Sequence, residues 1–206
     1  VGNTKSDIDT VVADLKAAGI NRVLALRGDR PAYMTDEQYN AREFEHATDM
    51  IAYLKETTDF QLAGACYPEK HFEAPNLETD IENLKRKVDA GADYIITQMF
   101  FDNKVYYDFV AKCRAAGITV PIIPGLKPIS TARQLTMLPE AFSLNIPIEL
   151  TSEIIKAGDD KTAIYQIGTE WCAMQCKDLI ANGAPAVHFY TMGKSDNISQ
   201  ILRECF

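Results

Sequence analysis

Predicted helices alternate with short apolar runs along the whole chain, and this alternation restricts the possible folds more than any other feature. The runs lack the every-other-residue pattern of a half-exposed strand, so they are typical of strands buried on both faces. Strands are predicted at residues 22–26, 61–66, 94–97, 120–125 and 186–190. Repeated helix-then-strand units pair their strands in parallel through right-handed crossovers. The sequence therefore predicts an α/β fold, either a barrel or an open doubly wound sheet.

Apolar residues three and four positions apart mark the helices between these strands. The first predicted helix spans residues 6–18 and ends at Gly19, a residue type that commonly stops helices. Further helices are predicted at residues 36–56, at 77–90, and around 106–113 with an end at Gly117. Residues 131–183 are predicted to be wholly helical, in pieces broken near Pro139, Pro147 and Gly158.

The number of units is small for a barrel. A (βα)8 TIM-type barrel usually needs about 250 residues, whereas this chain has 206 and opens on a helix with no strand before it. No Gly/Ser-rich linker or shift in composition divides the chain. We therefore expect a single α/β domain over residues 1–206, a TIM-type barrel of which about five βα units are present.

Composition and charge exclude several classes of protein. The chain is 47% hydrophobic, which excludes disorder, and contains no apolar run long enough for a membrane span. Its formal net charge is −8 and its basic residues are scattered, which argues against a nucleic-acid partner. We expect a cytoplasmic protein with structural thiols and no metal site, because Cys172 and Cys176 fit one helical face better than a zinc or redox motif.

Distinctive polar residues follow every predicted strand, at the positions where parallel α/β folds bind their ligands. These segments are residues 27–31, 67–71, 98–102, 124–128 and 190–194. Taken singly, Asp29 is as plausible as a helix cap as it is as a catalytic group, and His71 is an ordinary loop residue. Gln98 is harder to explain, because a buried carboxamide needs partners and its strand neighbours offer none. Together the segments favour a site for a polar organic ligand.

Two further observations bear on the ligand. Asp80 and Lys87 share the flank of the apolar stripe on the helix at 77–90, where they could reach a ligand or simply form part of a solvated face. The chain has no GxGxxG, GxxxxGK[ST], HExxH or GxSxG motif. Rossmann-type dinucleotide binding, P-loop chemistry, zincin chemistry and a nucleophile elbow are therefore disfavoured.

The strand-end segments resemble those of the methylenetetrahydrofolate reductases, a family of FAD-dependent (βα)8-barrel enzymes of one-carbon metabolism. The matching segments, in the family's order, are residues 24–29, 67–71, 84–92, 97–102, 123–125 and 188–191. The resemblance implies a ping-pong reaction in which NADH or NADPH reduces FAD, and the reduced flavin converts 5,10-methylenetetrahydrofolate to 5-methyltetrahydrofolate for methionine biosynthesis. It also leads us to expect a homo-oligomer.

The resemblance further implies roles for individual residues. Leu26, Arg27, Gly28 and Asp29 would lie along the flavin, where the Asp29 carboxylate would stabilise the cationic iminium form of the folate. Ala65, Tyr67 and His71 would line FAD, and Asp80 and Lys87 would bind its ribose and pyrophosphate. Gln98 would hold the pterin. Gln134, Tyr190 and Lys194 would contact folate or nicotinamide, although relatives often carry Arg at the last position, whose bidentate contact a Lys cannot make.

The resemblance covers the C-terminal two-thirds of the enzyme. The family's general-acid Glu, and a Thr and a His that contact FAD, would precede Val1. We therefore expect an exposed apolar sheet edge and poor solubility of the isolated chain. Two alternatives remain open: a barrel lyase or aldolase that acts on a phosphorylated metabolite through Lys87 or Lys127, and a non-catalytic flavin-binding or interaction module.

Overall fold

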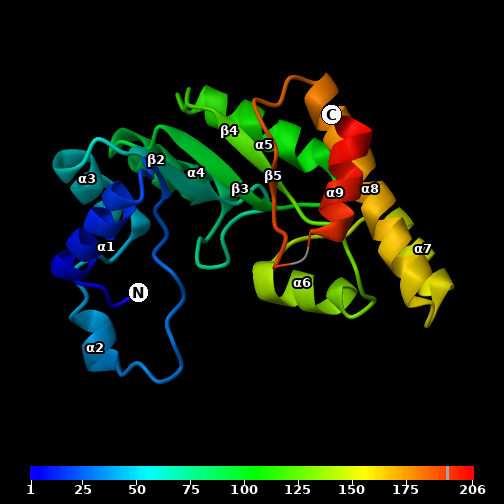
Figure 1. Ribbon diagram of the computed structural model, residues 1–206, viewed down its shortest axis with the longest axis horizontal. Helices are drawn as coiled ribbons and strands as arrows, with labels where there is room; N and C mark the ends of the chain where they lie inside the picture. The colour runs from blue at the N-terminus through cyan, green and yellow to red at the C-terminus, as the bar shows by residue number, and fades with distance from the viewer. Residues whose placement is uncertain (194) are drawn as a thin grey trace. The chain divides into compact units, whose positions relative to one another are not determined.

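The computed structural model describes residues 1–193 and 195–206 (Figure 1). One five-stranded sheet contains β1 (Arg22–Leu24), β2 (Gln61–Cys66), β3 (Tyr94–Met99), β4 (Ile122–Leu126) and β5 (His188–Phe189), in the spatial order β1-β2-β3-β4-β5. The strands run parallel, with Arg22 opposite Gln61 and Gly125 opposite His188. In a TIM-type barrel, strands that are neighbours in the sheet follow one another in the sequence. In a doubly wound sheet, the order of the strands reverses at a switch point. The predicted α/β class and five-unit partial barrel are confirmed.

Helices separate the strands, as predicted. Within the described residues they are α1 (Lys5–Ala17), α2 (Asp36–Asn40), α3 (Ala47–Thr57), α4 (Leu77–Asp89), α5 (Asn103–Ala115), α6 (Gln134–Phe142), α7 (Ile148–Ala157), α8 (Lys161–Ala181) and α9 (Asp196–Cys205). In the part of the chain that the structure describes, no helix combines the length and the apolar character that crossing a bilayer requires.

The chain divides into two compact units. Unit 1 contains residues 1–65 and 83–95, and unit 2 contains residues 66–82 and 96–206. Both β3 and α4 begin in one unit and end in the other, so the units share elements of secondary structure. The single domain over 1–206 stays a prediction.

The core of unit 1 forms where α3 and the second half of α4 cover the strands. Ile51 and Leu54 of α3 are 0% and 3% exposed, and Leu62 of β2 is fully buried. By contrast, α1 buries none of its residues completely, and its Val11 is 48% exposed. The apolar stripe that predicts α1 therefore marks the helix correctly but is only partly covered.

The first strand differs from its prediction. Residues 22–26 are predicted to be buried on both faces, yet β1 ends at Leu24, which is 37% exposed, and Leu26 beyond it is 51% exposed. The reason is that β1 is the edge of the sheet and pairs with β2 alone among the described strands. An exposed apolar edge is therefore present, as predicted.

The prediction of a single helix at residues 36–56 is wrong, because the segment forms two helices. Each helix has its own N-terminal cap: Thr35 Oγ1 accepts a hydrogen bond from Gln38 N (3.2 Å), and Asp49 accepts one from His46 N (2.8 Å). The His46 backbone is extended, with φ −130° and ψ 161°, which no helix interior allows. Side-chain capping thus outweighs the apolar periodicity that crosses this break.

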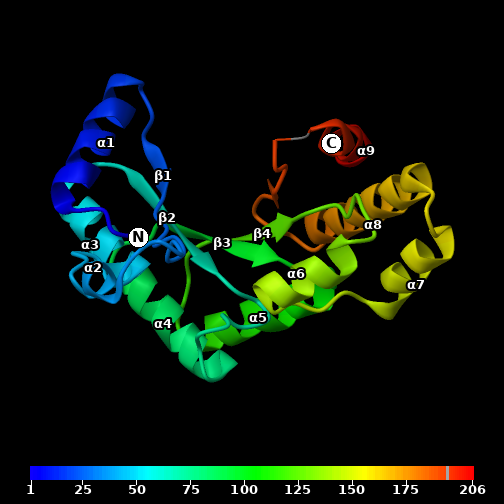
Figure 2. The same ribbon diagram turned by 90° about the horizontal axis from the view of Figure 1, so that it is seen from below.

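The core of unit 2 lies between the strands and helices α6 to α8, which Figure 2 shows with α7 alongside α8. It contains Met99, Phe101, Ile129, Leu138, Leu144, Leu150, Ile154 and Ile164. Helix α8 packs closely on the backbone of Ile129 at Gly168, where an added Cβ would lie 1.9 Å from the Ile129 carbonyl oxygen. Cys172 and Cys176 both lie on the buried side of α8, which confirms their placement on one helical face.

Several boundaries in the second half of the chain differ from prediction. The predicted break near Pro139 is wrong, because α6 runs through it and ends only at Ser143, whose left-handed φ is +52° and whose N–H bonds the Pro139 carbonyl. The breaks at Pro147 and Gly158 are confirmed as the two ends of α7. Helix α9 is absent from the prediction, because its apolar pattern, at Ile198, Ile201, Leu202 and Cys205, spans only about two helical turns.

Candidate functional site

The predicted flavin segment follows β1 in unit 1. Leu26 is half exposed, Asp29 is exposed, and Gly28 has a φ of +75°, a conformation that favours glycine because a Cβ would be strained there. Leu26, Gly28 and Asp29 are thus accessible in the loop beyond the strand. A glycine backbone without a side chain is also what lets a planar ligand come close to a loop.

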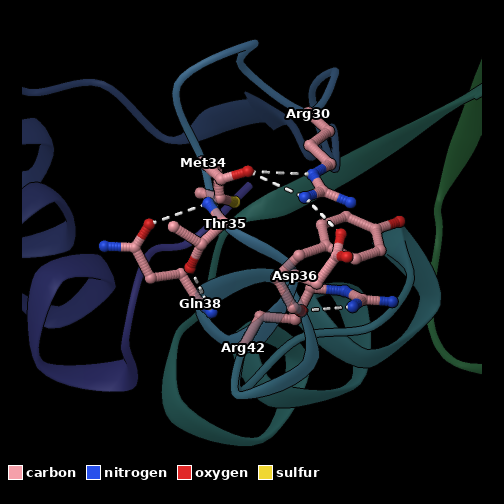
Figure 3. A network of polar contacts seen from close by, with 7 residues as sticks. Arg30, Met34, Thr35, Asp36, Gln38 and Arg42 are labelled. Atoms are coloured by element: carbon pink, nitrogen blue, oxygen red, sulfur yellow. Dashed lines mark hydrogen bonds and ion pairs between the residues drawn. The ribbon is translucent and has the colours of Figure 1, made fainter.

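A polar network folds the chain after Asp29 back onto itself (Figure 3). The Arg30 guanidinium donates hydrogen bonds to the Met34 carbonyl (2.7 Å) and to the Asp36 carboxylate (2.7 Å). Its charged carbon also lies 4.9 Å from the centre of the Tyr39 ring. These contacts bind the loop to α2, and they restrict the chain that follows Asp29.

The predicted pyrophosphate ligand Lys87 is brought to the end of β2. Its ammonium donates a hydrogen bond of 2.5 Å to the Ala65 carbonyl oxygen, so these two predicted site residues are in contact. The Lys87 stem packs on Gly64, where an added Cβ would lie 2.5 Å from Lys87 Cδ. Since an ammonium carries three N–H donors, the bond to Ala65 is compatible with a phosphate ligand on the same group.

In unit 2, the predicted residues Tyr67, His71 and Asp80 form one cluster. The Tyr67 and His71 rings meet edge-on with 4.4 Å between their centres. The Asp80 carboxylate accepts a hydrogen bond from the His71 backbone N–H (2.8 Å), and His71 Nδ1 accepts one from Glu73 N (3.1 Å). The ring orientation of His71 is therefore fixed, with Nε2 as the nitrogen that carries the proton in the neutral form.

Gln98 lies in β3 and is half-buried. Its Oε1 accepts a hydrogen bond from the N–H of the next residue, Met99 (3.0 Å). The expectation that its strand neighbours offer no partner is therefore wrong, because the carboxamide folds back onto its own strand. Its amide nitrogen donates no hydrogen bond within the described part of the chain, which leaves a donor that could contact a ligand.

The remaining predicted substrate contacts are held by other parts of unit 2. Gln134 Oε1 accepts hydrogen bonds from Ser130 N (2.7 Å) and Thr131 N (3.2 Å), so it stabilises the turn that starts α6. The Tyr190 hydroxyl donates to the Thr97 carbonyl oxygen (2.8 Å), and burial raises its pKa to about 12. Its ring lies over Gly125, where an added Cβ would come within 2.7 Å. Lys194 lies outside the described residues.

Burial also shifts the pKa values of groups outside the set of residues predicted for the flavin and folate site. It lowers the pKa of His188, whose ring meets Tyr190 edge-on at 4.9 Å, and it lowers the pKa of Lys127 after β4. Burial raises the pKa of the Cys113 and Cys176 thiols to about 12, which keeps them protonated at neutral pH. Among the described residues, no three His, Cys, Asp or Glu side chains are grouped as a metal site would require.

The structure also reveals contacts around Glu69 that sequence reasoning missed. Glu69 lies between Tyr67 and His71 in a predicted site segment, but its partner Asn145 is 76 residues away. No periodicity or motif connects two loop residues at that separation. Only the proline and glutamate of the segment, directly beyond a strand, mark the position as unusual.

The family model and the curated relatives that match this chain bear the name of one family. The family model described as methylenetetrahydrofolate reductase matches residues 1–205. A probable methylenetetrahydrofolate reductase (NADPH) of Caenorhabditis elegans is 37% identical over 97% of this chain and 30% of its own length. The 5,10-methylenetetrahydrofolate reductase of Escherichia coli is 35% identical over 94% of this chain and 63% of its own length. The chain thus spans between about a third and just under two thirds of these curated relatives.

Similarity to solved structures is lower. A protein from Clostridium thermocellum, described as binding two copies of 5-methyl-5,6,7,8-tetrahydrofolic acid, matches with a TM-score of 0.49 and 14% identity, over 98% of this chain and 90% of that chain. This similarity is too low to inform function.

Proposed function

Because the chain belongs to the methylenetetrahydrofolate reductase family, we propose that the protein containing it reduces 5,10-methylenetetrahydrofolate to 5-methyltetrahydrofolate. NADH or NADPH is the proposed hydride donor, FAD the proposed cofactor, and ping-pong the proposed kinetic order. The family match over residues 1–205 is the observation that carries the proposal. We also propose a cytoplasmic homo-oligomer, and the mostly buried cysteine thiols fit a reducing compartment.

The residues of unit 1 fit a flavin nucleotide chemically. FAD, when bound, supplies the group that accepts a hydride from nicotinamide and donates it to folate. We propose that the turn at Leu26, Arg27 and Gly28 supports this cofactor, since its glycine backbone allows close approach. Lys87 and Ala65 are the proposed partners of the pyrophosphate region, because an ammonium held at a strand end is suited to phosphate oxygens.

The residues proposed for FAD in unit 2, taken by themselves, also fit a flavin nucleotide chemically. Tyr67 and His71 form a rigid pair of rings, and a fixed aromatic surface suits a flat or sugar-bearing ligand. Asp80 is the proposed ribose contact. It already accepts the His71 N–H, so it can accept a ribose hydroxyl only through its remaining lone pairs.

Two residues are proposed to act on the reacting folate. The Asp29 carboxylate is exposed, and a negative charge near the folate would stabilise the cationic form that accepts hydride. The Gln98 amide nitrogen would donate to an acceptor atom of the pterin, since Gln98 Oε1 is engaged by Met99 N. Gln134 and Tyr190 remain proposed substrate contacts; for Tyr190 the ring is the part offered, because its hydroxyl donates to Thr97.

The proposal is tested by a steady-state assay of the full-length protein. Without oxygen, purified protein with FAD should oxidise NADH or NADPH beyond one equivalent of its flavin only when 5,10-methylenetetrahydrofolate is present, and 5-methyltetrahydrofolate should accumulate in an amount equal to this further oxidation. Double-reciprocal plots of initial velocity against the nicotinamide concentration, at several fixed concentrations of the folate, should be parallel if the kinetic order is ping-pong. Continued oxidation of the nicotinamide in the presence of 5,10-methylenetetrahydrofolate, without formation of 5-methyltetrahydrofolate, would contradict the proposed substrate.

One observation is relevant to the lyase or aldolase alternative. Burial lowers the pKa of Lys127, and a lowered lysine pKa is what Schiff-base chemistry requires. Borohydride treatment in the presence of phosphorylated aldehydes or ketones tests this alternative directly. We expect no covalent adduct on Lys127 or Lys87, and a trapped adduct would favour the aldolase.

A further inference from the structure

The segment between β2 and α4 is held in an unusual backbone shape. Lys70 has a left-handed φ of +81°, which is uncommon for a residue other than glycine. Its ammonium donates hydrogen bonds to the carbonyl oxygens of His71 (3.1 Å) and Ala74 (2.7 Å). These bonds, with the hydrogen bond from Ala74 N–H to the His71 carbonyl, hold residues 71–74 in a tight turn.

A second contact connects this segment to a distant loop of unit 2. The Glu69 carboxylate accepts a hydrogen bond from the Asn145 backbone N–H (2.9 Å) and another from the Asn145 side-chain amide. Asn145 lies between α6 and α7, whereas the anchors from Lys70 and Asp80 come from residues close in sequence. Loss of the Glu69 contact would therefore remove a long-range anchor of the segment without removing a core side chain, while the Lys70 and Asp80 contacts would remain.

The position of Glu69 is unfavourable for a carboxylate. Burial raises its pKa, and the nearby Asp102 carboxylate raises it further, while the two hydrogen bonds from Asn145 oppose the rise. A partly buried carboxylate that faces another negative charge costs stability unless hydrogen bonds compensate. The Asn145 contact supplies that compensation and fixes the segment at the same time.

We propose that Glu69 is a positioning residue of the cofactor site, which through Asn145 holds the 67–74 segment so that the Tyr67 and His71 rings present a fixed surface to FAD. The inference rests on the proposed function, because it takes FAD as the ligand of these rings. The edge-on contact between Tyr67 and His71 and the stacking of His71 on Phe72, with 4.6 Å between ring centres, define the surface that would be lost.

Binding of FAD to the full-length apoprotein tests the inference, with flavin fluorescence as the readout. We expect Glu69→Ala to raise the dissociation constant about tenfold, and Glu69→Gln, which keeps an acceptor oxygen, to change it less than threefold. Asn145→Ala keeps the backbone donor and should give an intermediate loss. Glu204→Ala is the matched control, because it also removes a hydrogen-bonded Glu, here from the exposed pair with Lys177, and should leave FAD affinity unchanged.

Hydrogen exchange of the apoprotein separates positioning from general destabilisation. Glu69→Ala should accelerate exchange of the His71 and Ala74 amides about tenfold, while the amides of α8 and the midpoint of thermal unfolding stay unchanged. The double variant Glu69→Ala/Asn145→Ala should bind FAD no more weakly than Glu69→Ala alone.

The possible failures are distinct. A wild-type protein that binds no FAD would overturn the proposed function and the positioning role together. A wild-type protein that binds FAD, with a Glu69→Ala variant that binds equally tightly, would overturn the positioning role alone. The positioning role is also overturned if FAD affinity and overall stability fall in parallel in every variant, including Glu204→Ala.

Discussion

Asp29 is an exposed carboxylate that we propose acts mainly on one half of the proposed two-step reaction. It follows Gly28 in the turn beyond β1, and the Arg30 network restricts the chain after it. A charge that stabilises a cationic folate matters when the folate is reduced, and matters little when nicotinamide is oxidised.

We expect Asp29→Asn to slow folate reduction by roughly a hundredfold while nicotinamide oxidation falls less than about fivefold. Anaerobic stopped-flow measurement of each half-reaction gives the two rates separately. Asp14→Asn, on the exposed surface of α1, is the matched control and should leave both rates unchanged. Equal losses in the two half-reactions would show that Asp29 has no selective role.

Lys87 is predicted to contribute its charge rather than its packing to cofactor binding. Lys87→Met retains a stem that can pack on Gly64 but removes the ammonium. FAD affinity should fall at least about tenfold, as expected for loss of a charge-assisted contact to phosphate. Titration of the apoprotein with FAD measures the loss, and Lys85→Met, which removes an exposed ion pair with Asp89, serves as control. Similar affinities for both variants would rule out the phosphate contact.

Glu69 predicts a pH dependence of stability with a definite sign. Its folded-state pKa is raised, so the folded protein holds the proton more tightly than the unfolded chain. The stability associated with this group is present below the unfolded value near 4.5 and is lost as pH rises through the folded-state pKa. Relative to wild type, Glu69→Gln should therefore gain stability as pH rises from about 4 to 7. Urea unfolding at both pH values measures this difference, and a constant difference would contradict the shifted pKa.

At the level of single residues, sequence predicts chemical character better than hydrogen-bond partners. Two groups of predicted site residues do make contacts within their units. Lys87 contacts Ala65 in unit 1, and His71 contacts both Tyr67 and Asp80 in unit 2. The partners of Gln98 and Tyr190 are not predictable, because they depend on side-chain rotamers and on a carbonyl 93 residues away. Pair contacts of this kind leave no periodic signal in a single sequence.

Among the secondary-structure elements, α8 shows how a close approach constrains one residue. Alanine is favoured over glycine in a helix interior by about 1 kcal/mol. At Gly168, however, a Cβ would meet the Ile129 carbonyl oxygen at 1.9 Å, so the backbone must move apart. Overpacking of this kind typically costs about 1–3 kcal/mol, more than the gain in helix propensity.

We therefore expect Gly168→Ala to lower the free energy of unfolding by up to about 2 kcal/mol net. Denaturant unfolding measures the change, and Glu170→Ala, at an exposed position of the same helix, should change stability by less than about 0.5 kcal/mol. A stabilised Gly168→Ala protein would mean that α8 does not pack this closely on Ile129.

Prediction of elements succeeds where apolar periodicity is long and fails where local capping or short length decides. The strands β2 and β3 and the helices α1, α4 and α5 lie where the periodic pattern indicates. The split between α2 and α3 arises from capping at Thr35 and His46, and the apolar pattern of α9 spans only about two helical turns. Pro139 shows the opposite error, since a residue expected to break a helix lies within one.

For the whole molecule, strand order carries most of the information about the fold. Alternation of helices and buried strands predicts a parallel α/β sheet, but it cannot distinguish a barrel from a doubly wound sheet. The observed order β1 to β5 resolves this choice. Placement of the exposed apolar residues Leu24 and Leu26 at the β1 edge also follows from this order, since β1 pairs with β2 alone among the described strands.

The central claim is that the protein is a flavoenzyme that passes hydride from a nicotinamide to methylenetetrahydrofolate, and the visible spectrum of the full-length protein tests it most directly. We predict a yellow protein whose flavin absorbance bleaches when NADH or NADPH is added without oxygen, and returns when 5,10-methylenetetrahydrofolate is added. A colourless protein with no affinity for FAD, or a bleached flavin whose colour does not return with the folate, would contradict the account.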